Sequence, residues 1–204
     1  YIILDGDQAV VIDPRREAEE YYCIAQKKGA SIKHIFETHR NEDFITGSRE
    51  LRRHSGAEIY HGKGLDFKFG NFTQEGDTFP LNNVCLKVLD TPGHTPESIS
   101  IALYSDKDCQ KALAVFTGDA LFVEDVGRTD FFPDEMKKYA GMLYDSIHEK
   151  ILPLGDHVAL YPAHGAGSVC GGGIADRELS TLGHEKISNP MLQLSREEFI
   201  TKKV

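Results

Sequence analysis

The sequence predicts a layered domain of the mixed α/β (α+β) class, with helices on the outer faces of paired β-sheets. Two observations support this fold class. First, each half of the chain passes from short strand-like runs to an amphipathic helical segment. Second, 204 residues with 40% hydrophobic content are enough for one core, and no internal repeat or low-complexity tract marks a second unit. We therefore expect residues 1–204 to form one domain.

The first half should begin with a β-hairpin. Residues 1–4 and 9–12 are strand-like, and Asp5-Gly6 between them supplies the positive φ of a tight turn. Apolar residues at mixed three-and-four spacing among charged ones then indicate an amphipathic helix that ends before Gly29. The elements expected after the hairpin are a helix at 16–28, a strand at 32–36, a helix at 43–54 and a strand at 58–60.

The second half is richer in short strands parted by turn residues. Ser195 and Glu198 have the Ser-x-x-Glu spacing of a capping box, which predicts a last short helix. The elements expected before it are strands at 83–89, 99–103 and 113–116, a helix at 133–150 and a strand at 158–161.

Charge and hydropathy exclude two kinds of partner. The net charge of −9 repels phosphate backbones and anionic lipid surfaces, so nucleic acid and membranes are not expected partners. The longest apolar stretches, such as 112–116, are far shorter than the roughly 20 residues that cross a bilayer. Residues 1–4 already have the character of a strand and lack an initiator Met, so we expect the first few residues to be missing.

The cysteines have no CxxC spacing. Cys23, Cys85, Cys109 and Cys170 are scattered through a chain too large to depend on disulfides, so we expect unpaired thiols and a cytoplasmic location.

Four strand-like runs are each followed by a histidine or an aspartate. These residues are His39, His94, Asp119 and His164, and glycine or proline stands beside most of them. One histidine alone would more often be a solvated or core residue than a ligand, but four such residues at strand ends can converge on one rim of a sandwich. The sequence therefore predicts a metal or catalytic site at that rim.

The residues around these positions resemble the metal motifs of the metallo-β-lactamase-fold superfamily. Within it, Gly127-Arg128-Thr129-Asp130 is similar to the persulfide dioxygenase and glyoxalase II branch, and 153–185 is most similar to members fused to rhodanese domains. The resemblance implies an αββα sandwich with the metal site at one edge of the two sheets, and a rhodanese region beyond the C-terminus. The matching motifs, in order, are 38–44 (THRNEDF), 91–95 (TPGHT), 117–122 (TGDALF) and 162–165 (PAHG).

Two departures from the family pattern are informative. The usual first motif is Thr-His-x-His-x-Asp-His, and here Asn41 and Phe44 replace its second and third histidines. A dinuclear zinc centre of the hydrolytic type would lose one imidazole from each metal, and phenylalanine cannot ligate a metal. These replacements argue against hydrolysis by two bridged metals.

The ligands that remain are His39, His94 and Asp119. Two imidazoles and one carboxylate form the facial triad of non-haem Fe(II) oxygenases, in which the open positions bind O2 and substrate. By resemblance, the persulfide dioxygenases hold a single iron with the residues that align to these three. We therefore expect one Fe(II) per chain, with zinc as the alternative metal.

Four further residues are candidates for the site. Asp43 would orient a ligand imidazole or bound water, or act as a helix N-cap. His164 would hydrogen-bond substrate or bound water, with direct metal ligation as the alternative. Arg128 would hold a substrate carboxylate, or pair with Asp130. Cys170 would carry or receive persulfide sulfur, or be a buried spectator thiol.

The resulting hypothesis is a persulfide dioxygenase that converts a thiol persulfide and O2 to sulfite and thiol. The substrate would be a glutathione-like or protein persulfide, with a rhodanese domain in cis or in trans as partner, and a homo-oligomer is left open. Two alternatives remain: a zinc-dependent thioester hydrolase of the glyoxalase II type, and a non-catalytic or sulfur-relay module that works with rhodanese domains. One iron per chain would favour oxidation, and two zinc ions would favour hydrolysis.

Overall fold

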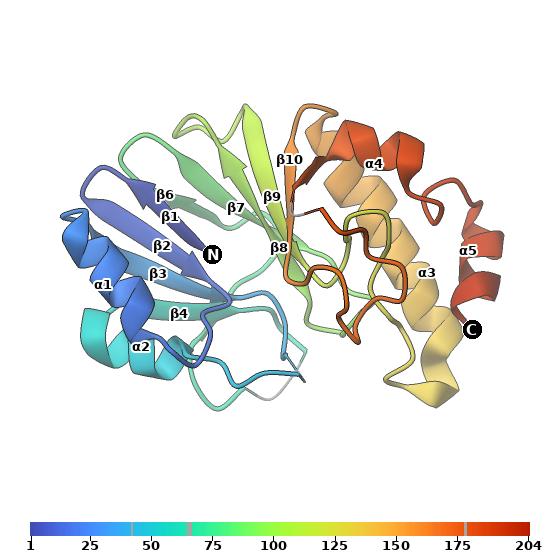
Figure 1. Cartoon of the computed structure of the whole chain (residues 1–204), viewed down its shortest axis with the longest axis horizontal. Helices are drawn as coiled ribbons and strands as arrows, with labels where there is room; N and C mark the ends of the chain where they lie inside the picture. Colours follow the sequence, from blue (N-terminus) through green and yellow to red (C-terminus); the bar gives the residue numbers. More distant parts are fainter. Residues whose placement is uncertain (42, 65–66, 178) are drawn as a thin grey trace.

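Two β-sheets lie face to face between outer layers of helices in this computed structural model, which describes residues 1–41, 43–64, 67–177 and 179–204 (Figure 1). The two sheets and their covering helices confirm the expected αββα sandwich. Among the described residues, no helix has the length and apolar character that crossing a bilayer requires.

The first sheet has the strand order β1-β2-β3-β4-β5. The hairpin strands β1 (Ile2–Asp5) and β2 (Gln8–Ile12) are antiparallel, as expected, and β2, β3, β4 and β5 then run parallel. Because parallel neighbours need a crossover connection, α1 (Glu19–Lys27) links β2 to β3, and α2 (Ser48–Ser55) links β3 to β4. The remaining strands are β3 (Ser31–Glu37), β4 (Glu58–His61) and β5 (Asn71–Phe72).

The second sheet has the order β11-β10-β9-β8-β7-β6. Its middle is an antiparallel meander of β7, β8 and β9, and β10 lies parallel to β9 after the crossover helix α3 (Met136–Ser146). The strands are β6 (Thr78–Pro80), β7 (Cys85–Asp90), β8 (Ile99–Tyr104), β9 (Ala112–Gly118), β10 (Ala159–Pro162) and β11 (Ser180–Thr181). Helices α4 (Leu182–Ser188) and α5 (Arg196–Lys203) complete its outer layer, and α5 begins with the predicted capping box.

Both faces of each sheet are buried, and the side chains alternate between two apolar layers. Along β2, Val10 and Ile12 lie between the sheets, whereas Ala9 and Val11 pack with residues of α1 and α2. This burial on both faces explains why β2 is a continuous apolar run instead of an alternating one. The layer between the sheets contains Val10, Ile12, Phe36, Leu86, Val88, Ile99, Ile101 and Phe116.

The longer predicted elements are confirmed, and the errors concern short elements and boundaries. The helix expected at 43–54 begins five residues later, at Ser48, and the helix expected at 133–150 is divided into a 3-10 turn, α3 and a π-helical stretch at Ile147–Ile151. Strands β5, β6 and β11 are two or three residues long and carry no readable periodicity. Helix α4 is also absent from the sequence prediction.

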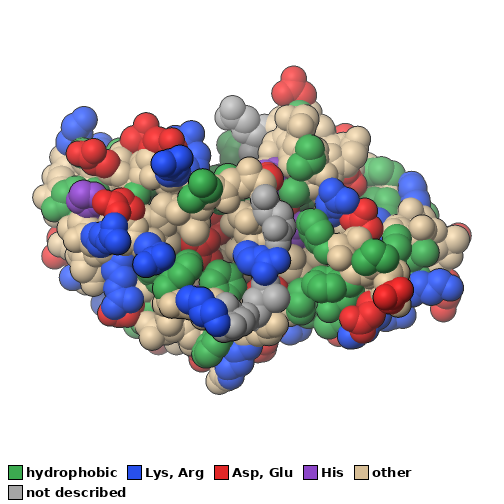
Figure 2. All heavy atoms as spheres, turned by 90° about the horizontal axis from the view of Figure 1, so that it is seen from below, with side chains coloured by type: hydrophobic (Ala, Val, Ile, Leu, Met, Phe, Trp, Pro, Cys, Tyr) green, Lys and Arg blue, Asp and Glu red, His purple; other side chains and the backbone are tan. Residues whose placement is uncertain are grey.

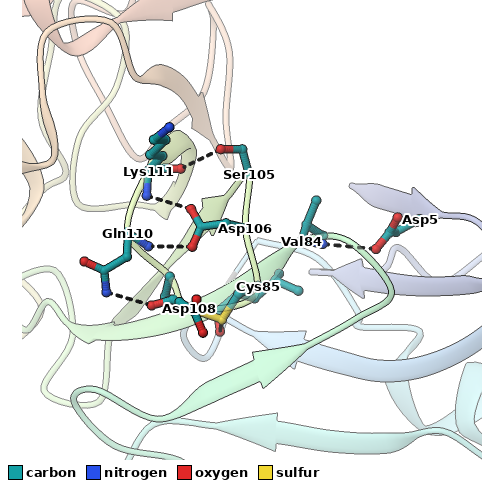
Figure 3. The surroundings of a disulfide bond; sticks show 10 residues. Asp5, Val84, Cys85, Ser105, Asp106, Asp108, Gln110 and Lys111 are labelled. Atoms are coloured by element: carbon teal, nitrogen blue, oxygen red, sulfur yellow. Dashed lines mark hydrogen bonds between the residues drawn. A yellow bond between two sulfur atoms is a disulfide. The ribbon is translucent and has the colours of Figure 1, made fainter.

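The expectation that all four cysteines are unpaired is wrong for two of them. Cys85 and Cys109 form a disulfide, with Cα atoms 5.6 Å apart (Figure 3). Strand register causes this proximity: Cys85 lies opposite Tyr104 in the β7–β8 pair, and the following turn brings Cys109 back. The Asp106 carboxylate closes that turn by accepting hydrogen bonds from two backbone N–H groups. Cys23 and Cys170 are the free cysteines. Because the other two are paired, the cysteines do not support the expected cytoplasmic location.

Candidate metal centre

The four candidate residues leave the sheets at one edge. His39 follows β3, His94 follows β7, Asp119 follows β9 directly, and His164 follows β10. Because β9 and β10 are parallel neighbours, Asp119 and His164 emerge on the same side. The ends of the four strands thus bring to one edge of the sandwich side chains that are far apart in the sequence.

Close backbone contacts fix this edge. The Ile99 N–H at the start of β8 donates to the Thr38 carbonyl at 2.8 Å, which ties the second sheet to the end of β3. The Ala163 N–H donates to the Gly118 carbonyl at 2.9 Å. Gly118 has φ 54°, and a Cβ there would lie 2.6 Å from Thr38 Oγ1, so only glycine fits between the segments that carry His39 and Asp119.

His39, His94 and Asp119 form one compact, buried cluster. Asp119 Oδ2 lies 3.3 Å from His94 Nε2 and 3.7 Å from His39 Nε2, and the two imidazole rings meet edge to face at 4.9 Å. All three side chains are at most 2% exposed. This geometry brings together the three residues that the sequence analysis proposed as metal ligands.

Hydrogen bonds to the far ring nitrogens determine which nitrogen of each histidine carries a lone pair. Thr38 Oγ1 donates to Asp13 Oδ2 at 2.7 Å, so at its 3.0 Å contact with His39 Nδ1 it accepts a hydrogen bond from the ring N–H. His94 Nδ1 lies 2.9 Å from the Arg128 carbonyl, which can only accept. Both imidazoles therefore present an unprotonated Nε2 toward Asp119.

The electrostatics of the cluster keep its histidines neutral and its carboxyl group ionised. Burial lowers the pKa of His39 to about 3 and lowers the pKa of His94 as well. Burial alone would raise the pKa of Asp119, but His164, His39 and His94 together hold it below its usual value. Neutral imidazoles and an ionised carboxylate are the protonation states that metal ligation requires.

These donor atoms fit a metal ion. Asp119 Oδ2 is buried without a hydrogen-bond partner in the described part of the chain, and two nitrogen lone pairs face it. Electron pairs directed at one another in a buried site need a cation between them. Two donors that each lie about 2.1 Å from one ion stand roughly 3 to 3.5 Å apart, close to the observed separations.

A second group of potential ligands adjoins the first. The donor atoms of Asp43, His164 and Cys170 lie within 4.8 Å of one another. His164 Nε2 is 3.4 Å from Asp43 Oδ2 and 3.3 Å from Asp119 Oδ1. Asp119 therefore directs Oδ2 toward the two histidines of the first group and Oδ1 toward His164 of the second. Burial acts to lower the pKa of His164, but Asp119 and Cys170 outweigh it and raise that pKa to about 10.

Asp43 does not cap a helix, so the N-cap alternative is wrong. The N-cap position of α2 is Gly47, and the Thr46 and Ser48 hydroxyls donate to the buried Glu37 carboxyl group. These contacts fasten the start of α2 to the end of β3 and leave Asp43 in the preceding loop, where its carboxylate lies 3.4 Å from His164 Nε2.

The two residues that replace histidines occupy the same loop. The Asn41 side-chain amide donates to the His39 carbonyl at 3.4 Å, which is a long and weak hydrogen bond. Phe44 lies in the wall between two cavities, one of 710 Å³ and one of 500 Å³. The larger cavity is also lined by Asp43 and His164, and His164 Nε2 lies 3.3 Å from Asp119 Oδ1.

Arg128 is held by its own neighbours. Its guanidinium group makes two hydrogen bonds to the Asp130 carboxylate, at 2.6 and 2.8 Å, and lies over the Phe131 ring. Phe131 in turn packs edge to face against His94. The structure therefore shows the alternative pairing with Asp130, and among the described residues Arg128 does not line the larger cavity.

Sequence reasoning missed Asp13 and Thr38. Asp13 accepts hydrogen bonds from the Thr38 N–H at 2.8 Å and the Thr38 hydroxyl at 2.7 Å, which fixes the acceptor for His39 Nδ1. The available signal was an aspartate directly after the apolar run 9–12, the same pattern that marked Asp119.

The fold and the site together define an αββα sandwich with a histidine and aspartate ligand set at one edge. Residues 1–164 match the metallo-beta-lactamase superfamily, and the chain belongs to this superfamily.

The chain is similar to relatives of two kinds. It is 33% identical to the mitochondrial persulfide dioxygenase ETHE1 of Mus musculus, over 98% of this chain and 74% of that protein. It is 30% identical to the hydroxyacylglutathione hydrolase GloC of Haemophilus influenzae, over 92% of this chain and 89% of that protein. A metallo-beta-lactamase structure from Staphylococcus aureus matches with a TM-score of 0.87 and 33% identity, covering 100% of this chain. This chain spans 66% of the length of that structure.

Proposed function

We propose that this chain is a persulfide dioxygenase that uses one Fe(II) held by His39, His94 and Asp119. The observation that carries the proposal is the donor set: two neutral imidazoles and one orphaned carboxylate converge, while Asn41 and Phe44 stand where a hydrolytic centre would have ligands. The similarity to the mouse persulfide dioxygenase over 98% of the chain supports the same activity. Bound iron would supply the one-electron chemistry with O2 that amino-acid side chains lack.

The overall change is RSSH + O2 + H2O → RSH + H2SO3. The terminal sulfur is oxidised, O2 is reduced, the S–S bond breaks, and the inner sulfur leaves as a thiol that takes up a proton. His164 Nε2 lies between Asp43 Oδ2 and Asp119 Oδ1, at 3.4 and 3.3 Å, where it can hold a proton for the departing thiolate. The substrate enters through the 710 Å³ cavity, which Asp43 and His164 line.

Cys170 is proposed as a carrier of persulfide sulfur next to the substrate. It is 5% exposed, and its Sγ lies within 4.8 Å of the donor atoms of Asp43 and His164. The spectator alternative predicts that Cys170→Ser keeps full sulfite production. Loss of single-turnover sulfur transfer from a labelled persulfide in Cys170→Ser, with iron content unchanged, would support the carrier role.

The second candidate function is zinc-dependent hydrolysis of a glutathione thioester. One observation favours it: Asp119 Oδ1, His164 and Asp43 lie close enough to hold a second ion, even though the motif has lost two histidines. The similarity to the hydroxyacylglutathione hydrolase of Haemophilus influenzae supports this reading as well. A rhodanese domain in cis or in trans remains a proposed partner for either sulfur chemistry.

The decisive experiment is anaerobic reconstitution with Fe(II), followed by oxygen uptake and sulfite formation on glutathione persulfide. We expect one iron per chain and equal amounts of O2 consumed and sulfite formed. His39→Ala should abolish iron binding. Asn41→His should not be needed to obtain it, because wild-type protein with Asn41 should already bind iron. Two zinc ions per chain with thioester hydrolysis, and no oxygen uptake by fully iron-loaded protein, would replace the proposal with the hydrolase. The non-catalytic alternative predicts neither activity.

A further inference from the structure

Glu97 is a buried acidic residue in the loop that carries His94. It lies three residues after His94, between β7 and β8, and is 2% exposed. Its carboxylate belongs to neither group of potential metal ligands in the described part of the chain. Glutamate is almost never buried to this extent unless it is paired, so the surroundings of Glu97 should contain a partner for its charge.

One oxygen of Glu97 is bound to the loop that carries the other histidine. Glu97 Oε1 accepts a hydrogen bond from the Arg40 N–H at 2.8 Å. Further along the same segment, the Ile99 N–H donates to the Thr38 carbonyl at 2.8 Å. The peptide groups on both sides of His39 are therefore bound to the segment that contains Glu97.

The backbone of Glu97 is itself held on two sides. A Cβ at Gly62 would lie 2.0 Å from the Glu97 carbonyl oxygen, so glycine permits the chain after β4 to approach this closely. Within the loop, the Thr95 N–H donates to Ser98 Oγ at 3.2 Å, and the Thr91 N–H donates to the Ser98 carbonyl at 2.9 Å. The carboxylate therefore extends from a backbone position that its neighbours define.

The second oxygen of Glu97 has no partner. In the described part of the chain, Glu97 Oε2 is buried without a hydrogen bond. Glu185, which is also buried, differs because both of its oxygens accept hydrogen bonds. Its donors are the Ser180 hydroxyl, the Glu124 N–H and the Asn189 side-chain amide. Burying a carboxylate is costly unless it is hydrogen-bonded and paired, so Glu97 lacks something that Glu185 has.

The basic residues on the surface do not supply the missing charge. Lysine and arginine side chains gather on the half of the face in Figure 2 that carries α1 and α2, and Arg52 and Arg53 of α2 pair there with exposed glutamates. Among the described residues, none of these cations forms an ion pair with Glu97.

A divalent cation in the metal centre would supply it. Two neutral imidazoles and the Asp119 carboxylate would leave such an ion with one uncompensated positive charge, which the charge of Glu97 would balance. Burial lowers the pKa of His94, and Asp119, the Arg128 carbonyl and Glu97 act against that effect, so the field of Glu97 reaches this imidazole. Charges interact strongly where water is excluded.

We propose that the Glu97 carboxylate supplies a second negative charge, besides that of Asp119, which strengthens the binding of a divalent cation. Glu97 does not touch the metal: it acts through its charge, and the hydrogen bond to the Arg40 N–H orients its carboxylate. The buried charge is therefore costly in the metal-free protein and favourable in the metal-bound one. The inference rests on metal binding in the proposed function and does not depend on persulfide oxidation.

Two substitutions separate the charge of Glu97 from its hydrogen bond. Glu97→Gln keeps an acceptor for the Arg40 N–H and removes the charge, whereas Glu97→Asp keeps the charge and shortens the side chain. Competition with a chromophoric chelator gives the Kd for zinc. We expect this Kd to rise by about tenfold or more in Glu97→Gln, and by less in Glu97→Asp. A larger rise in Glu97→Asp would assign the effect to the hydrogen bond and overturn the proposal.

Urea titration of the metal-free protein gives a second readout. Because Glu97→Gln removes an uncompensated buried charge, its urea midpoint should equal or exceed that of wild type. Glu185→Gln is the matched control: it should lower the urea midpoint, since the lost charge was hydrogen-bonded by three donors, and leave the zinc Kd unchanged. An unchanged zinc Kd in Glu97→Gln, or a raised Kd accompanied by a lower urea midpoint, would overturn the proposal.

These outcomes separate the inference from the proposed function. A raised zinc Kd in Glu97→Gln, together with iron-loaded wild-type protein that makes no sulfite, would support the role of Glu97 and refute the dioxygenase. Sulfite formation by wild type, together with equal zinc Kd values in wild type and Glu97→Gln, would do the reverse. Failure of wild type to bind either zinc or iron would overturn both.

Discussion

Asp13 holds Thr38 through two hydrogen bonds, one to its backbone N–H at 2.8 Å and one to its hydroxyl at 2.7 Å. This arrangement leaves a lone pair on Thr38 Oγ1 to accept from His39 Nδ1. Asp13 is therefore a positioning residue: it acts on the His39 ring through Thr38. Such outer partners set both the tautomer and the orientation of a metal-binding imidazole.

Replacement of Asp13 by asparagine should weaken metal binding. The amide NH2 group can donate to Thr38 Oγ1, so the Thr38 hydroxyl can turn its own proton toward His39 Nδ1 and favour the other tautomer of the ring. We expect metal affinity to fall by roughly 10- to 100-fold. Competition with a chromophoric chelator measures the Kd. Asp77→Asn is the matched control, because Asp77 also accepts hydrogen bonds from a threonine hydroxyl and a backbone N–H, those of Thr73 and Gln74. Equal affinity in both variants would refute the positioning role.

Breaking the disulfide should reduce stability and leave metal affinity unchanged. Cys85 and Cys109 are separated by 24 residues. Closing a loop of that size lowers the entropy of the unfolded chain, which stabilises the folded protein by about 3 kcal/mol. Cys109→Ser should lower the free energy of unfolding by about that amount in urea titrations. The disulfide lies at the ends of β7 and β9 remote from His94 and Asp119, so the metal Kd of the variant should match wild type. Cys23→Ser, which removes an unpaired thiol, is the control.

Stability should fall on mild acidification because of His34. Burial lowers the pKa of His34, whose Nδ1 has no hydrogen-bond partner in the described structure and whose ring packs against Phe36, Tyr60 and Phe79. Its folded pKa lies below the unfolded value, so the contribution is fully present above about pH 6.5 and is lost as pH falls through the folded pKa.

His34→Phe should reduce this pH dependence. Urea titrations at about pH 7.5 and about pH 5.5 bracket the unfolded pKa of histidine, and the loss between them should be smaller in the variant than in wild type. The difference between the two proteins isolates His34 from the other titrating groups. Identical losses in both would mean that His34 does not contribute.

Arg128→Gln should affect stability slightly and thiol binding hardly at all. Arg128 and Asp130 are 40% and 42% exposed, so their pair is screened by solvent, and we expect a loss of about 1 kcal/mol or less. The Kd for glutathione should stay within about twofold of wild type, because Asp130 already occupies the Arg128 guanidinium group. A large rise in the Kd would return Arg128 to the role of carboxylate binder.

The sequence predicted the features that depend on local pattern. The β1–β2 hairpin follows from Asp5-Gly6 between two apolar runs, and the last helix follows from the capping box at Ser195. The convergence of His39, His94 and Asp119 follows from their position after strands, although their grouping depended on family resemblance as well.

The remaining features depend on contacts that local pattern does not contain. The Cys85–Cys109 bond arises from the register of β7 and β8, and α2 begins at Ser48 because Glu37 anchors that serine from a neighbouring strand. Asp13 acquires its role only when β2 and β3 are side by side. The disulfide, the start of α2 and the role of Asp13 each depend on contacts between segments that a local sequence pattern does not reveal, so they could not be predicted from one sequence.

The Cys85–Cys109 bond presents its two sulfur atoms unequally. Cys85 is 1% exposed, whereas Cys109 is partly exposed. Thiol exchange therefore favours attack on the sulfur of Cys109, with Cys85 as the leaving thiolate. One thiol would therefore form a mixed disulfide with Cys109 and free Cys85, which opens the link between β7 and the turn before β9 at the sheet end remote from His94 and Asp119.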